Sequence, residues 1–168
     1  MHASNIDSAL PKPALYAQLA GELRSLIEGE PDMIANLANM AALLYHALPQ
    51  LNWCGFYLLK GGELVVGPFQ GKPACVRIAM GKGVCGTAAA KRASVIVPNV
   101  NEFPGHIACD TASNSEIVVP MIRGGELIGV LDLDSPNLAR FDEQDRNGLE
   151  KLVAVLMAPV MTPSFPTD

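Results

Sequence analysis

The sequence predicts a single α+β domain whose central sheet is mainly antiparallel. Segments 13–28 and 32–48 near the N-terminus, and 142–157 near the C-terminus, carry apolar residues at helical spacing. Between them, short apolar runs are joined by glycine turns, which is typical of strands linked in hairpins. Such strands pair antiparallel, so this order of segments favours an α+β domain over one with a parallel sheet.

Local signals mark the ends of the three long helices. The first helix has an apolar residue at every fourth position from Leu15 to Ile27. The second begins at Asp32, directly after a proline, and closes before Pro49. Asp142 is the expected N-cap of the last helix, because its carboxylate can accept hydrogen bonds from the free amides of the first turn.

Runs of aliphatic and aromatic residues predict the strands. They are expected at 53–59 and 63–67, near 75–78, at 94–97, and at 116–122 and 126–134. A short helix is expected in the Ala-rich half of 81–92. Residues 98–114 have no apolar periodicity and predict a long loop, which in a compact domain is usually functional or mobile. The domain is expected over 13–158, between tails at 1–12 and 159–168.

Composition argues against several classes of protein. Hydrophobic residues make up 49% of the chain and charged residues 17%, so it can bury a core and does not resemble a disordered chain. The net charge of −5 and the lack of a basic cluster argue against nucleic acid as a partner. We see no signal-peptide pattern and no apolar run long enough for a membrane span, so we expect a cytoplasmic protein, where thiols stay reduced.

The four cysteines lie in different settings. Cys54, within a predicted strand, is expected to be a buried hydrophobe. Cys109 lies in the polar loop three residues after His106, where a reactive thiol is a better explanation than burial. For Cys75 and Cys85 burial and redox chemistry both stay open. No spacing matches a structural zinc site, so no metal is expected.

Three carboxylates are expected at one end of the sheet. Asp132 and Asp134 stand two apart in a strand and share a face, and Glu116 begins the strand that pairs with it. They are either strand-end acids that face solvent or a site for a cationic ligand group. Crowded carboxylates raise each other's pKa, so one of them can stay protonated and act as an acid.

Trp53 and Tyr57 also share a strand face. Such a pair more often belongs to a hydrophobic core than to a binding site. An aromatic wall is nevertheless suited to binding a methyl-bearing, partly positive sulfur centre. The glycine-rich segment 81–86 is too short for a phosphate-binding loop, although amides at a helix start could bind a carboxylate.

Together these segments resemble the free methionine-(R)-sulfoxide reductases, which use a GAF fold. The resemblance rests on Trp53-Cys54-Gly55-Phe56-Tyr57, Gly67-Pro68-Phe69-Gln70-Gly71, Cys75, Gly81–Gly86, His106-Ile107-Ala108-Cys109, Ser115-Glu116-Ile117-Val118-Val119-Pro120 and Gly129–Ser135. It covers nearly the whole chain and implies a single GAF-like domain.

The resemblance also implies roles for individual residues. It makes Cys109 the catalytic cysteine and Cys75 the resolving cysteine, with Cys85 as a third thiol that serves either as an alternative resolving cysteine or as a relay. Substrate binding falls to Glu116, Asp132, Asp134, Trp53 and Tyr57. The implied reaction is reduction of free methionine sulfoxide, with no cofactor and with thioredoxin or another dithiol as reductant. A homodimer is expected, since GAF domains often pair through their terminal helices.

Two other functions stay open at this point. A non-catalytic GAF sensor would bind a small molecule, but such a module is usually joined to a signalling domain, for which 168 residues leave no room. A redox switch would use the cysteines alone and would not need Glu116, Asp132 and Asp134 beside them. Turnover of methionine sulfoxide with a dithiol distinguishes both from a reductase.

Overall fold

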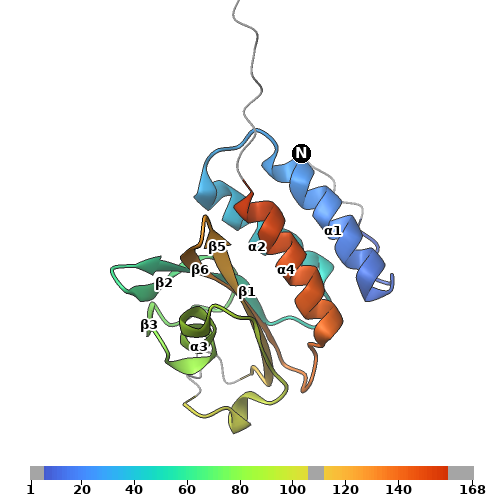
Figure 1. Ribbon diagram of the computed structural model, residues 1–168. Coiled ribbons are helices and arrows are strands. Elements are labelled where there is room, and N and C mark those ends of the chain that lie inside the picture. Colours follow the sequence, from blue (N-terminus) through green and yellow to red (C-terminus); the bar gives the residue numbers. More distant parts are fainter. Residues whose placement is uncertain (1–5, 106–111, 159–168) are drawn as a thin grey trace, which may run out of the picture.

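A six-stranded antiparallel sheet forms the centre of the protein (Figure 1). The structure, a computed structural model, describes residues 6–105 and 112–158. The strands are β1 (Trp53–Lys60), β2 (Glu63–Gly71), β3 (Arg77–Ala79), β4 (Val95–Val97), β5 (Ser115–Arg123) and β6 (Glu126–Ser135). They lie in the order β3-β2-β1-β6-β5-β4, and each neighbouring pair is antiparallel, which confirms the predicted fold class.

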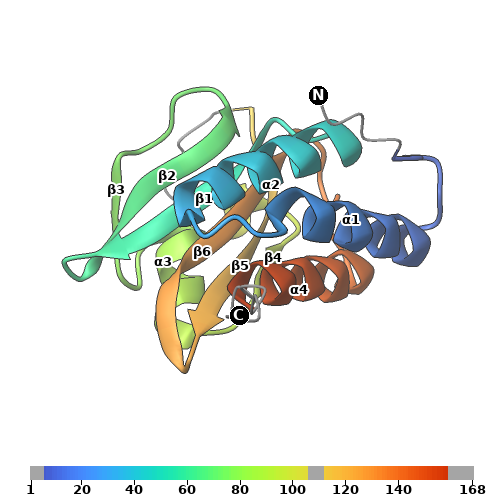
Figure 2. The same ribbon diagram turned by 90° about the horizontal axis from the view of Figure 1, so that it is seen from above.

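Helices cover the two faces of this sheet unequally (Figures 1 and 2). On one face lie α2 (Met33–Ala47), against β1 and β2, and α4 (Glu143–Met157), against β5, with α1 (Lys12–Ile27) packed on α4. The other face carries α3 (Gly83–Lys91), which contacts β5 and β6. Asp142 caps α4 as predicted, accepting from the amides of Gln144 and Asp145.

Strand alternation produces two separate cores. In β1, Cys54 and Phe56 point into the core beneath the long helices, whereas Trp53 and Tyr57 point into the core beneath α3. Cys85, from α3, belongs to that second core. The predicted face of Trp53 and Tyr57 is therefore the face that α3 covers.

The strand β2 extends four residues beyond its predicted end at Gly67. A proline cannot donate to a strand ladder, so Pro68 made the strand appear to stop. The register shifts between Gly55 and Tyr57 on β1, and this irregularity accommodates Pro68 while Phe69 pairs with Gly55.

The predicted long loop contains one short element. Residues 100–102 form a 3-10 helix, η1 (Val100–Glu102), which the absence of apolar periodicity did not indicate. Positions 106–111 lie outside the described residues. Over the described ranges, no helix has both the length and the apolar character needed to cross a membrane.

Candidate active site

The register of three neighbouring strands brings the predicted carboxylates together. Glu116 on β5 lies opposite Asp134 on β6, and Asp134 lies opposite Trp53 on β1. Asp132, two residues before Asp134, is on the same face and opposite Gly55. A shared face and matched register, as the sequence predicted, place acidic and aromatic side chains at one end of the sheet.

These side chains line a single small cavity beneath α3. Its lining residues include Trp53, Tyr57, Cys85, Glu116, Asp132 and Asp134, together with Lys72, Pro73, Ala74, Ile78, Gly83, Val84 and Ser113. The five residues predicted to bind substrate thus meet in one place. The cavity volume is about 40 Å³, below the roughly 300–1,000 Å³ of pockets that enclose drug-sized molecules. An amino acid enters only if the walls move.

Two of the carboxylates, those of Glu116 and Asp132, are buried and have raised pKa values. Burial, reinforced by repulsion from Asp132 and Asp134, raises the pKa of Glu116 well above its usual value. Burial likewise raises the pKa of Asp132, to about 7. Because the two groups are coupled, the pair retains a proton at neutral pH. The site therefore offers a carboxylic acid, which can donate a proton to a bound oxygen.

Cys85 packs against this pair. Its Sγ lies 3.9 Å from Glu116 Oε1, to which the thiol donates a hydrogen bond. Burial raises the pKa of the Cys85 thiol, and the charges of Asp132 and Glu116 raise it further. Cys85 is thus a protonated, buried thiol, whereas a nucleophile has to ionise.

The aromatic residues form a stacked wall of the cavity. The rings of Trp53 and Tyr57 are 5.9 Å apart with an interplanar angle of 26°, and Trp53 and Phe69 are 5.3 Å apart at 15°. Trp53 Nε1 donates to the carbonyl of Lys72 at 3.1 Å. The wall requires Gly55, because a Cβ at that position would lie 2.7 Å from the Trp53 ring.

The remaining cysteines fall in three different places. Cys75 is half-buried and disulfide-bonded, and its carbonyl accepts a 3.1 Å hydrogen bond from the Tyr57 hydroxyl at the cavity wall. Cys54 is free and fully buried in the opposite core, as predicted. Cys109, the predicted nucleophile, and the neighbouring His106 lie outside the described residues.

Sequence reasoning assigned no role to two residues at the site, Ser113 at the cavity edge and Phe69 beside Trp53. Ser113 is buried at this edge and accepts a 2.9 Å hydrogen bond from Asn52 Nδ2. Phe69 stacks on Trp53 although the predicted strand ended before it. Neither belongs to a periodic pattern. The available signals were Asn52, directly before β1, and Gly71, the last residue of β2, because polar and glycine residues at strand ends often border a site.

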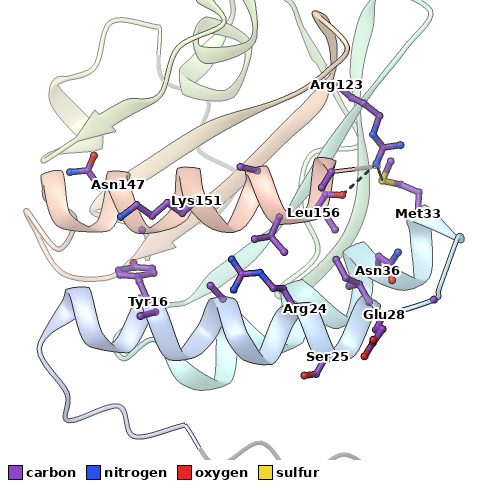
Figure 3. A pocket seen from close by; sticks show the side chains of 18 of the residues that line it. Tyr16, Arg24, Ser25, Glu28, Met33, Asn36, Arg123, Asn147, Lys151 and Leu156 are labelled. Atoms are coloured by element: carbon purple, nitrogen blue, oxygen red, sulfur yellow. Dashed lines mark hydrogen bonds between the residues drawn. The ribbon is translucent and has the colours of Figure 1, made fainter. Parts of the chain in front are cut away.

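A larger groove lies elsewhere, between α1 and α4 (Figure 3). Its volume is about 1210 Å³, and it contains none of the predicted site residues. Arg24 extends into it from α1, Lys151 borders it on α4, and Arg123 closes one end by donating to the Leu156 carbonyl at 3.4 Å. This surface has no cluster of nucleophilic or acidic groups, so it is a poor candidate for catalysis.

Comparison with known proteins places the chain in a family. The GAF domain family model matches residues 35–157. The free methionine-R-sulfoxide reductase of Escherichia coli K12 is 50% identical over 92% of this chain and 93% of its own length. The free methionine-R-sulfoxide reductase of Neisseria meningitidis, solved in complex with its substrate, is 48% identical with a TM-score of 0.89, covering 94% of both chains. A GAF protein from Burkholderia vietnamiensis is 63% identical with a TM-score of 0.86, covering 88% of this chain and 94% of the other.

Proposed function

The chain belongs to the free methionine-R-sulfoxide reductase family of GAF domains, and from this premise we propose that it reduces free methionine (R)-sulfoxide to methionine. The observation that carries the proposal is the cavity beneath α3, where an acid pair meets an aromatic wall. A sulfoxide oxygen leaves only when protonated, so the reaction needs a carboxylic acid that is still protonated at neutral pH. The coupled pair Glu116 and Asp132 supplies one.

We propose that Cys109 provides the nucleophile. Its thiolate attacks the sulfur of the protonated sulfoxide to give a sulfurane that joins the two sulfur atoms. The hydroxyl then passes from the substrate sulfur to the Cys109 sulfur as the S–S bond breaks, so methionine leaves with an electron pair restored on its sulfur and Cys109 becomes a sulfenic acid. A second thiol then attacks this sulfur, which releases water and forms a disulfide. Two thiols are thereby oxidised while one sulfoxide is reduced.

Cys75 is the better candidate for the second thiol. It is disulfide-bonded beside the cavity, which supports a redox role for this cysteine. Cys85 suits the resolving role less well, because burial against carboxylates keeps its thiol protonated. We therefore assign Cys85 to the wall of the site and Cys75 to resolution.

The remaining carboxylate and the aromatic wall would orient the substrate. Asp134 is half-buried at the cavity and can accept hydrogen bonds from the ammonium group of a free amino acid. Trp53 and Tyr57 would hold the methyl-sulfur end through contacts with their ring faces.

Product analysis on the separated sulfoxide epimers tests the proposed activity. The reduced chain should convert the (R) epimer of free methionine sulfoxide to methionine and leave the (S) epimer. Cys109→Ser should abolish this conversion, whereas Cys54→Ser, a change in the opposite core, should retain it. A chain that binds the sulfoxide without forming methionine would instead be a GAF sensor.

A thioredoxin-type dithiol protein is the proposed reductant, since a disulfide at Cys75 must be reopened in each cycle. We also propose that the chain pairs with a second copy through its terminal helices, where the groove between α1 and α4 offers the surface. Turnover coupled to a thioredoxin system tests the first point. Sedimentation of the purified chain tests the second.

A further inference from the structure

Cys85, Glu116 and Asp132 form a three-way cluster that the proposed reaction does not fully explain. One ligand atom from each residue, a thiol sulfur and two carboxylate oxygens, lies within 4.8 Å of the other two. All three side chains are buried, and they come from α3, β5 and β6. No element of the reaction requires a thiol in contact with both carboxylates.

One oxygen atom of the cluster is a hydrogen-bond acceptor without a donor among the described residues. Asp132 Oδ1 is buried and has no hydrogen-bond partner among the described residues, although a buried carboxylate oxygen is normally paired. Asp132 lines the cavity, whose volume of about 40 Å³ exceeds the roughly 10–15 Å³ that a single water requires. The cavity that Asp132 lines therefore has room for one small ion together with a water.

We propose that Cys85, Glu116 and Asp132 are the three protein ligands of a binding site for a Zn²⁺ ion. Zinc accepts sulfur and oxygen donors together, at about 2.3 Å and 2.0–2.2 Å, so bonding draws the three donor atoms closer than their present separations. The fourth position of a tetrahedral ion remains open for water. On coordination the Cys85 thiol and the Glu116–Asp132 pair release their protons to solvent, and the sulfur bonds the metal as a thiolate.

The donor set selects among metals. A thiolate favours zinc over magnesium or calcium, which take oxygen ligands and need six or more of them. A divalent ion placed among the three charged ligands also offsets the repulsion between the two buried carboxylates. The sequence did not indicate this site, because the residues are 31 and 16 positions apart and match no zinc spacing.

The site has a consequence for catalysis that rests on the proposed function. An ion bound to Glu116 and Asp132 takes the place of the shared proton and fills the cavity. Zinc is therefore expected to inhibit sulfoxide reduction in competition with the substrate, although its binding does not depend on that activity.

Zinc titration of the oxidised full-length chain tests the metal site directly. In this form Cys75 is disulfide-bonded and is not available as a ligand, while Cys54 and Cys85 are free. Calorimetry with Zn²⁺ should give one site per chain, and Mg²⁺ should give none. Titration with Co²⁺ should produce a near-ultraviolet charge-transfer band, which reports a metal–thiolate bond independently of activity.

Variants identify the ligands. Cys85→Ala and Asp132→Asn should each weaken zinc binding by about tenfold or more, since even outer-shell partners of a metal are worth 10–100-fold. Cys54→Ala, which removes the other free buried thiol, should leave both zinc affinity and the cobalt band unchanged. Retention of the band in Cys85→Ala, or its loss in Cys54→Ala, would overturn the site. Zinc that binds through Cys85 without slowing sulfoxide reduction would overturn only the inhibition.

Discussion

Glu116 and Asp134 lie directly opposite each other in the register of β5 and β6. Two acidic side chains in this arrangement destabilise an antiparallel pair, and Asp132 on the same face adds a third acidic group. A sheet that only needed to fold would place an apolar or oppositely charged residue there. These acidic groups stand at the end of the sheet where the small cavity lies, which is the arrangement expected of a binding site.

Replacing Glu116 by Gln should stabilise the protein above neutral pH while impairing reduction. Because the pKa of Glu116 is raised on folding, the folded chain holds this proton more tightly than the unfolded chain does. Stability is thus lost as the pH rises from the ordinary glutamate value of 4.5 through the folded value. The variant, which cannot ionise, escapes this loss.

The advantage of Glu116→Gln should be absent near pH 4 and reach about 1–3 kcal/mol near pH 8, measured by denaturant unfolding at both values. Glu126→Gln, an exposed position in the same hairpin, is the matched control and should show no such trend. If the free energy of unfolding depends on pH equally in wild type and Glu116→Gln, then ionisation of Glu116 does not destabilise the folded protein.

Cys75→Ser should separate the first turnover from the following ones. The first methionine needs only the nucleophile and the acid, so a rapid-quench burst of one equivalent should persist. Steady-state turnover with thioredoxin should fall by about tenfold or more, because no disulfide forms for the reductant to open. Cys85→Ser, at a buried and protonated thiol, should retain thioredoxin-dependent turnover to a greater extent. Loss of the burst in Cys75→Ser would assign Cys75 to the chemical step.

Gly55→Ala should displace the aromatic wall. A Cβ at this position would lie 2.2 Å from Phe69 Cβ and 2.7 Å from the Trp53 ring, so one strand or the ring must shift. We expect a loss of about 1–3 kcal/mol in unfolding free energy and a raised KM for the sulfoxide. Trp53 is the single tryptophan of the chain, so its fluorescence reports the displacement.

The control for this change is Gly21→Ala. Gly21 lies in α1 with no atom within 4 Å of an added Cβ, so alanine should be neutral or stabilising there. An unchanged tryptophan spectrum in Gly55→Ala would mean that the wall does not depend on this glycine.

The sequence predicted the parts of the site that depend on strand periodicity. The two-residue spacing of Asp132 and Asp134 gives a shared face, and a Gly-Gly turn sets the hairpin that brings Glu116 opposite. The same rule assigned Trp53 and Tyr57 to one face of β1. These are local properties, and local rules suffice for them.

Contacts between elements could not be predicted in this way. Cys85 contacts Glu116 because α3 packs across β5 and β6. The sequence of α3 alone does not indicate which strands it packs against, and the strand sequences do not indicate the helix. Asp145 is a second example, because its place in the predicted helix 142–157 does not indicate its partners. Its buried carboxylate accepts a 2.9 Å hydrogen bond from the Tyr16 hydroxyl, and this bond joins α1 to α4. The same carboxylate also accepts from Arg140.

The free amino acid, rather than an oxidised residue in a protein, should be the substrate. Acetylation of the amino group removes its positive charge, so that Asp134 would face an uncharged amide in place of an ammonium group. Breaking one member of a buried charge pair costs ~3–5 kcal/mol, which corresponds to a loss of hundreds-fold or more in kcat/KM. Because Asp134 is half-buried, the lower end of this range applies.

Three compounds at equal concentration decide the matter: free methionine sulfoxide, its N-acetyl form and its C-terminal amide. The amide keeps the ammonium and should lose less activity than the N-acetyl form. In Asp134→Asn the penalty for acetylation should shrink, because the carboxylate that recognises the ammonium is gone, and this coupling separates recognition from a general steric effect. Efficient reduction of the N-acetyl form by the wild-type chain would show that the acidic cluster does not bind an ammonium group.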